Sequence, residues 1–135
     1  MLVVLDTNVV VSGLLLAESY PGQVLEAVYA GEVTALYDDR IVAEYADVLA
    51  RPKFPIEPGD IDLFLGVLDY GVVVVAPPLP LKMPDEDDLK FIEVAVAGGA
   101  DAIVTGNARH FRVREGKLDV RIVSPRGLIE MLRDS

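Results

Sequence analysis

The segment DEDDLKFIEVAVAGGADAIVTGN, residues 85–107, contains an acidic run, a helix and a strand in direct succession. Apolar residues recur at helical spacing from Phe91 to Ala95, and Gly98-Gly99 follows them as a stop signal. Residues 102–105 then form a short apolar run, as in strands that are covered on both faces. The segment predicts one helix–strand unit of an α/β fold.

The rest of the chain shows the same alternation on both sides of this segment. The further predicted strands are 2–5, 33–37, 72–75 and 121–123, and the further predicted helices are 19–30, 41–50, 61–70 and 125–132. Alternating strands and helices imply a mostly parallel sheet with helices on both faces, a three-layer α/β/α fold. The length of 135 residues and the 52% hydrophobic content suit a single domain over residues 1–135.

Composition limits the chemistry and the location. Cysteine is absent, so a metal would bind to oxygen ligands or to His110, which favours hard cations such as Mg²⁺ or Mn²⁺. The apolar start MLVVLDTNVVVSGLLL has no basic segment before it and is interrupted by Asp6. Neither a signal peptide nor a membrane span fits that pattern, and the expected location is cytoplasmic.

The charge balance of 12 basic and 22 acidic residues, net −10, argues against a protein that simply coats nucleic acid. It is compatible with a nuclease, because carboxylates that hold a divalent metal are uncompensated until the metal binds. Basic residues gather at 51–53 and 109–117. Each of them taken alone suits a solvated charge, but together they leave room for local phosphate contacts.

Asp6 directly follows the first predicted strand, at the sheet edge where parallel sheets bind ligands. A carboxylate there is costly to desolvate unless it is paired, hydrogen-bonded or bound to a metal. The alternative is a helix N-cap or a turn residue. Asn8 stands close by in an otherwise apolar run and is a candidate to orient the carboxylate of Asp6.

Three further polar residues occupy comparable places. Glu44 lies beside the apolar stripe of its predicted helix, either as a ligand or as a boundary residue whose head reaches water. Asp88 begins the predicted helix that carries Phe91, Ile92 and Ala95, either as a ligand or as a favourable charge at the helix N-terminus. Asn107 follows a predicted strand, either at a ligand or in a turn.

Combined with LDTNV (5–9), AEYADVLARPKF (43–54), RHF (109–111) and IVSPRGLIEML (122–132), the segment 85–107 resembles the PIN domain. The likeness is to PIN-family toxins of bacterial and archaeal toxin–antitoxin systems. It covers essentially the whole chain, and residues 85–111 carry its most specific motif.

This resemblance implies a metal-dependent endoribonuclease that cleaves single-stranded or loop RNA with a metal-activated water. The implied cofactor is Mg²⁺ or Mn²⁺. The implied partners are RNA, a small antitoxin protein and a second copy of the chain.

Carried over by position, the resemblance makes Asp6, Glu44 and Asp88 the catalytic and metal-binding acids. Asp88, seven residues before Ala95, is chosen over Asp87 because the helix motif of the family counts back to it and because it lies on the core-facing side of the predicted helix.

A fourth acid, frequent in the family, is replaced here by Asn107, whose amide oxygen remains a possible metal ligand. One firmly held metal is therefore a safer expectation than two. Thr105 resembles the family's hydroxyl residue at the site, and Asn8 resembles the amide beside the first aspartate.

Two other functions fit parts of the pattern. An aspartyl-nucleophile phosphotransferase also places an aspartate after its first strand, but it needs a second acid two residues later, where this chain has Asn8. A degenerate PIN fold that acts as a non-catalytic interaction module would explain Asn107 and the negative charge.

Overall fold

The computed structural model describes residues 1–83, 85–111 and 120–134. Its sheet has five strands in the order β3-β2-β1-β4-β5, and every pair is parallel. The strands are β1 (Leu2–Leu5), β2 (Thr34–Tyr37), β3 (Val72–Val73), β4 (Ala102–Val104) and β5 (Ile122–Val123). The central strand β1 is apolar throughout, and Val3, Val4 and Leu5 are fully buried. A parallel strand covered on both faces requires such a run.

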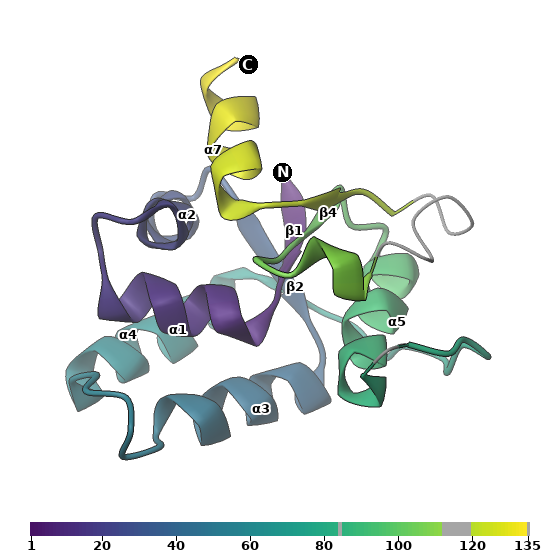
Figure 1. Ribbon diagram of the computed structural model, residues 1–135, viewed down its shortest axis with the longest axis horizontal. Helices are drawn as coiled ribbons and strands as arrows, with labels where there is room; N and C mark the ends of the chain where they lie inside the picture. Colours follow the sequence, from purple (N-terminus) through teal and green to yellow (C-terminus); the bar gives the residue numbers. More distant parts are fainter. Residues whose placement is uncertain (84, 112–119, 135) are drawn as a thin grey trace.

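The helices lie on both faces of this sheet. They are α1 (Thr7–Leu15), α2 (Tyr20–Tyr29), α3 (Asp39–Leu49), α4 (Pro58–Val67), α5 (Leu89–Gly98) and α7 (Pro125–Arg133), with 3₁₀ turns η1 (Leu68–Tyr70), η2 (Glu86–Asp88) and η3 (Ala108–His110). Chain crossovers are right-handed, so the path from β1 through β2 to β3 and the return to β4 carry their helices on opposite faces. Figure 1 shows α5 on one side of the strands and α1 and α2 on the other. The predicted α/β fold with a mostly parallel sheet is confirmed.

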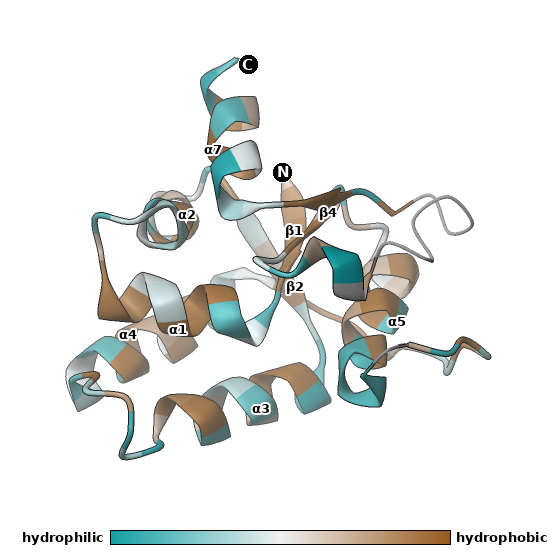
Figure 2. Cartoon of the chain, viewed as in Figure 1, coloured by the Kyte–Doolittle hydropathy of each residue, from teal (hydrophilic) through white to brown (hydrophobic). Residues whose placement is uncertain are grey.

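Hydrophobic residues concentrate on the central strands, whereas the start of α5 and the turn after β4 are hydrophilic (Figure 2). The carboxyl ends of all five parallel strands lie at the same edge of the sheet, and both hydrophilic segments are near that edge. The starts of α1, α3 and α5 lie near this edge (Figure 1). Within the described residues, no helix is long and apolar enough to cross a membrane.

Two local predictions differ from the structure. Residues 7–15 form α1, which was not predicted, because the three consecutive valines at 9–11 obscure the helical spacing of the exposed residues Asn8, Ser12 and Leu15. Residues 72–75 were the clearest predicted strand, yet only Val72 and Val73 pair, and Val75 is 96% exposed. The partner strand ends at Tyr37, opposite Val73, so little of β2 remains for a longer strand.

The end of α5 packs tightly on the sheet. A Cβ placed on Gly98 would lie 2.4 Å from Cδ2 of Leu36, which is fully buried in β2. Gly99 then ends the helix with a φ of +66°, a backbone conformation that costs glycine little. The predicted stop at this glycine pair is confirmed, and its first member permits the close approach of α5 and β2.

We expect Gly98→Ala to destabilise the fold by about 1–3 kcal/mol, because the added methyl overpacks the contact with Leu36. Gly66→Ala is the control, since Gly66 is an exposed residue of α4 and a Cβ there meets no atom within 4 Å. It should stabilise by roughly 0.5–1 kcal/mol through helix propensity. Urea unfolding followed by circular dichroism measures both. Equal effects of the two substitutions would contradict the tight contact.

Candidate active site

Asp6 lies at the carboxyl end of the central strand and is the residue that precedes α1. It is 6% exposed, and its peptide N–H donates to the carbonyl of Val104 at 3.0 Å, which continues the pairing of β1 with β4. Its carboxylate makes no cap hydrogen bond to α1. Instead, the hydroxyl of Thr105, which is fully buried, donates to Oδ2 of Asp6 at 2.7 Å. Thr105 and Asp6 are thus joined across the sheet edge, where the sequence placed them.

Burial raises the pKa of Asp6 above its ordinary value of 3.8. The hydrogen bond from Thr105 and the nearby backbone N–H of Asn8 lower this pKa, and repulsion from Glu44 raises it again. The side chain of Asn8 is exposed, so its described influence on Asp6 comes through its backbone. The orienting role of the Asn8 amide stays a prediction.

Glu44 projects from α3 toward Asp6 and is partly buried, as its place beside the apolar stripe predicted. Its two carboxylate oxygens have different partners. The hydroxyl of Thr7 donates to Oε2, and the ammonium of Lys90 lies 2.8 Å from Oε1. Neither Thr7 nor Lys90 was singled out from the sequence, because nothing in the local pattern pairs position 44 with position 90.

Tyr45 anchors α3 beneath this group. Its ring is buried, and its hydroxyl donates to the carbonyl of Leu5, the last residue of β1. Burial raises the pKa of Tyr45 well above 10, and repulsion from Asp6 and Glu44 adds to the effect. The carboxylates of Asp6 and Glu44 therefore both lie near the buried hydroxyl of Tyr45. The sequence indicated Tyr45 only as a core residue of its helix.

Asp88 and Asn107 lie around this centre in different ways. Asp88 is the residue before α5, is half-buried, and its peptide N–H donates to the carbonyl of Asp85 at 3.1 Å. Asn107 is exposed, and its peptide N–H donates to the hydroxyl oxygen of Thr105 at 3.0 Å. A chain of hydrogen bonds thus runs from the backbone of Asn107 through Thr105 to Asp6.

The predicted basic surfaces lie only partly within the described residues. Arg51 pairs with Asp47 at 2.9 Å, and the ammonium of Lys53 lies 5.1 Å from the ring centroid of Phe54. These contacts agree with solvated surface charges. Residues 112–119 and the side chain of His110 lie outside the description.

Two comparisons with known proteins identify the family of this chain and one relative. The family model of the PIN domain matches residues 2–109, which include every candidate site residue. The chain belongs to the PIN domain family. The chain is also similar to a protein of Methanocaldococcus jannaschii described as uncharacterized, with 27% identity over 139 aligned positions that cover 95% of this chain and 89% of the relative. PIN domains are generally nucleases.

The donors of this PIN domain suit a divalent metal in their chemistry. Carboxylate, hydroxyl and amide oxygens are the ligands that Mg²⁺ and Mn²⁺ prefer. Asp6 and Glu44 repel each other, and a cation between them would relieve that repulsion. Among the described residues, however, no three acidic or histidine side chains are grouped closely enough to hold a metal. Asp6 and Glu44 are brought together, and Asp88 does not complete a group with them.

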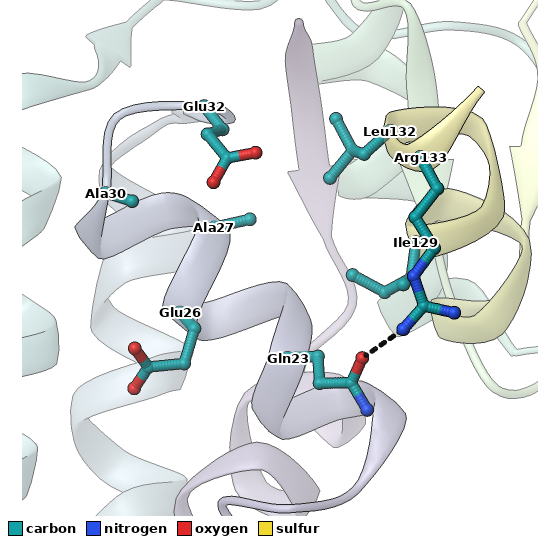
Figure 3. A pocket seen from close by; sticks show the side chains of 8 residues that line it. All are labelled: Gln23, Glu26, Ala27, Ala30, Glu32, Ile129, Leu132 and Arg133. Carbon is teal, nitrogen blue, oxygen red and sulfur yellow. Dashed lines mark hydrogen bonds between the residues drawn. The ribbon is translucent and has the colours of Figure 1, made fainter. Parts of the chain in front are cut away.

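A groove elsewhere on this PIN domain does not belong to the site. It has a volume of about 340 Å³ and lies between α2 and α7, where Arg133 donates to Gln23 at 3.3 Å (Figure 3). Its lining includes Ala30 and Glu32, which lie between the end of α2 and the start of β2. The groove is thus near the amino ends of the strands, and the candidate acids are at the carboxyl ends.

We expect Asp6→Asn to raise the Tm of the PIN domain at pH 7 in EDTA. A raised folded pKa means that the folded state holds the proton of Asp6 more tightly than the unfolded chain does. The stability that this group contributes is present below pH 3.8 and is lost as the pH rises through the folded pKa. The gain in Tm should therefore shrink as the pH falls toward 4.

The matched control is Asp62→Asn, which removes the same charge from an exposed position on α4. It should change the stability by no more than about 0.5 kcal/mol. Differential scanning calorimetry across the pH range measures both variants. A lower Tm of Asp6→Asn at pH 7 would show that the ionised carboxylate is stabilising and would contradict this account.

Proposed function

We propose that this PIN domain is a metal-dependent endoribonuclease that cleaves single-stranded or loop RNA. The observation that carries the proposal is the buried carboxylate of Asp6 at the carboxyl end of the central strand, hydrogen-bonded by Thr105 and placed beside Glu44. A pair of neighbouring carboxylates at the ligand-binding edge of a parallel sheet is typical of a functional site. Family membership supports the same reading.

Within the proposal, Asp6, Glu44 and Asp88 hold Mg²⁺ or Mn²⁺, with the amide of Asn107 as a further ligand. When bound, the metal supplies an activated water and neutralises charge on the scissile phosphate. The protein's own contribution is orientation. Thr105 holds one oxygen of Asp6 through a 2.7 Å hydrogen bond, which restricts the rotation of the carboxylate.

Glu44 is also oriented by a hydrogen bond from a threonine hydroxyl. Thr7 follows Asp6 directly and donates to Oε2 of Glu44, which connects the first turn of α1 to α3. Asp6 and Thr7 are neighbours at the start of α1, and Thr7 binds Glu44. The start of α1 therefore fixes the position of the Glu44 carboxylate relative to the Asp6 carboxylate. This arrangement keeps the pair in place before a ligand arrives.

The substrate follows from charge and access. A net charge of −10 gives no general attraction for a polyanion, so binding depends on the metal and on local cations such as Arg109, which is exposed in η3. Unpaired RNA can bring a single phosphate to a narrow acidic edge, whereas a regular duplex presents its phosphates on a rigid surface. Single-stranded and loop RNA are therefore the proposed substrates.

The toxin role is a further part of the proposal. Family membership supports a pairing with a small antitoxin protein and a homodimeric state, and a cytoplasmic location accords with both. A short reading frame adjacent to the gene, whose product binds this chain and suppresses cleavage, is the expected partner.

We expect Asp6→Asn to abolish cleavage of an unstructured, end-labelled RNA in Mg²⁺ or Mn²⁺, and EDTA to abolish cleavage by the wild type. The substitution removes a ligand charge without removing the hydrogen-bond acceptor for Thr105, so the fold should persist. Circular dichroism checks the fold, and Asp62→Asn is the active control. Wild-type cleavage that persists in EDTA would refute the proposed metal dependence.

Asp88 and Asp87 provide a sharper comparison within the acidic run. Asp88→Asn should reduce the cleavage rate about 100-fold or more, as for a lost metal ligand, whereas Asp87→Asn should stay within about threefold of wild type. Asp87 is exposed in η2, so the two changes remove equal charge from adjacent positions. Equal effects would refute the assignment of Asp88 as the third acid.

A second candidate function is an interaction module without catalysis. Two observations favour it. Lys90 forms an ion pair with Glu44. Among the residues that the structure describes, no three acidic or histidine side chains lie close enough together to hold a metal. The same RNA assay decides between the two functions. Absence of cleavage over all Mg²⁺ and Mn²⁺ concentrations would favour the module.

A further inference from the structure

Lys90 places a cation at the candidate active site. Its ammonium lies 2.8 Å from Oε1 of Glu44 and donates to the carbonyl of Asp87 at 2.5 Å. The side chain of Lys90 is 13% exposed and that of Glu44 is 28% exposed, so this ion pair is largely removed from water. Surface pairs contribute little, whereas a sheltered pair interacts strongly.

The ion pair with Lys90 hinders the binding of another cation to the carboxylate of Glu44. Thr7 already donates to Oε2, and Lys90 holds Oε1. A divalent metal at Oε1 would lie within a few ångströms of the ammonium, and two cations repel each other at that distance. Either the ammonium moves away or the metal binds more weakly.

Helix α5 determines the position of Lys90. Lys90 stands in the first turn of α5, two residues after Asp88, and its ammonium lies 5.1 Å from the ring centroid of Phe91, a buried core residue. The packing of α5 on the sheet therefore positions the lysine as firmly as it positions Asp88. One helix start carries both the proposed third acid and a cation directed at the second acid.

We propose that Lys90 is an internal cation that competes with Mg²⁺ or Mn²⁺ for the carboxylate of Glu44 and so sets the metal affinity of the site. The inference rests on the proposed function, because it takes Glu44 as a metal ligand. Metal binding then requires the Lys90–Glu44 pair to open. The lysine keeps the site weak for metal and stabilises the carboxylates when no metal is bound.

Isothermal titration with Mn²⁺ alone tests the competition without any RNA. We expect Lys90→Met to bind Mn²⁺ about tenfold more tightly than wild type, because the competing ammonium is gone. Lys90→Arg keeps the positive charge and should bind as weakly as wild type. Lys53→Met is the matched control, since Lys53 is exposed and its ammonium also lies 5.1 Å from the ring of the next residue, Phe54. It should leave the affinity within about twofold.

A double-mutant cycle separates competition at Glu44 from a general effect of charge. In the background of Glu44→Gln, the pair is already lost, so Lys90→Met should no longer tighten Mn²⁺ binding. Circular dichroism confirms that each variant is folded, and Lys90→Gln replaces Lys90→Met should the methionine variant be unstable.

The outcomes are distinct. Unchanged or weaker Mn²⁺ binding by Lys90→Met would overturn the inference, and so would the same tightening in the Glu44→Gln background. Binding by Lys90→Met but not by wild type would support it in its strongest form. Mn²⁺ binding by wild type without RNA cleavage would refute the proposed function and leave the competition to be decided by the affinities. No binding by any variant would overturn both.

Discussion

The buried carboxyl group of Asp6, held where β1, β4 and α1 leave it little contact with water, is the constraint on which the rest of the site depends. A buried carboxylate needs hydrogen-bond donors or a cation nearby. Thr105 supplies one donor, and the like charge of Glu44 works against it. The neighbours of Glu44 in turn become necessary, since Thr7 and Lys90 offset a second carboxylate that would otherwise add to the repulsion. The polar side chains at this edge are thus consequences of placing one acid at the end of the central strand.

A second buried carboxylate shows what a purely structural solution looks like in the same protein. Glu93 is 4% exposed in α5, yet both of its oxygens are engaged, one by Arg40 at 2.8 Å and the other by the peptide N–H of Leu79 at 2.7 Å. Arg40 also binds Asp38, the residue that caps α3. This network is satisfied by hydrogen bonds and ion pairs, and it fixes the segment before η2 to α5 and α3. Asp6 accepts a hydrogen bond from Thr105 but faces the like charge of Glu44, and a buried acid in such surroundings at a ligand-binding edge is more typical of a functional group than of a structural one.

The register of the sheet explains why the two ends of the hydrogen bond meet. Leu5 pairs with Val104, so the residues that follow each strand, Asp6 and Thr105, emerge side by side. Parallel pairing makes this juxtaposition automatic once β1 and β4 are neighbours. Their adjacency depends on the chain returning from β3 across the sheet to the far side of β1. The site is therefore formed at the point where the strand order reverses, which is the place where open α/β sheets bind their ligands.

The sequence by itself determined the fold class and the placement of Asp6 and Thr105, because apolar runs, glycine stops and strand ends are local signals. It also indicated that Glu44 lies beside an apolar stripe, and the structure confirms this. Helix α1 was not predicted, since three consecutive valines at 9–11 obscure the helical spacing of its exposed residues Asn8, Ser12 and Leu15. Only the tertiary structure decided the partners of Glu44, because a contact between α3 and α5 depends on how helices pack across the sheet edge and leaves no trace in local spacing. For the same reason the sequence listed three acids as equals, whereas the fold brings Asp6 and Glu44 together and pairs Glu44 with Lys90.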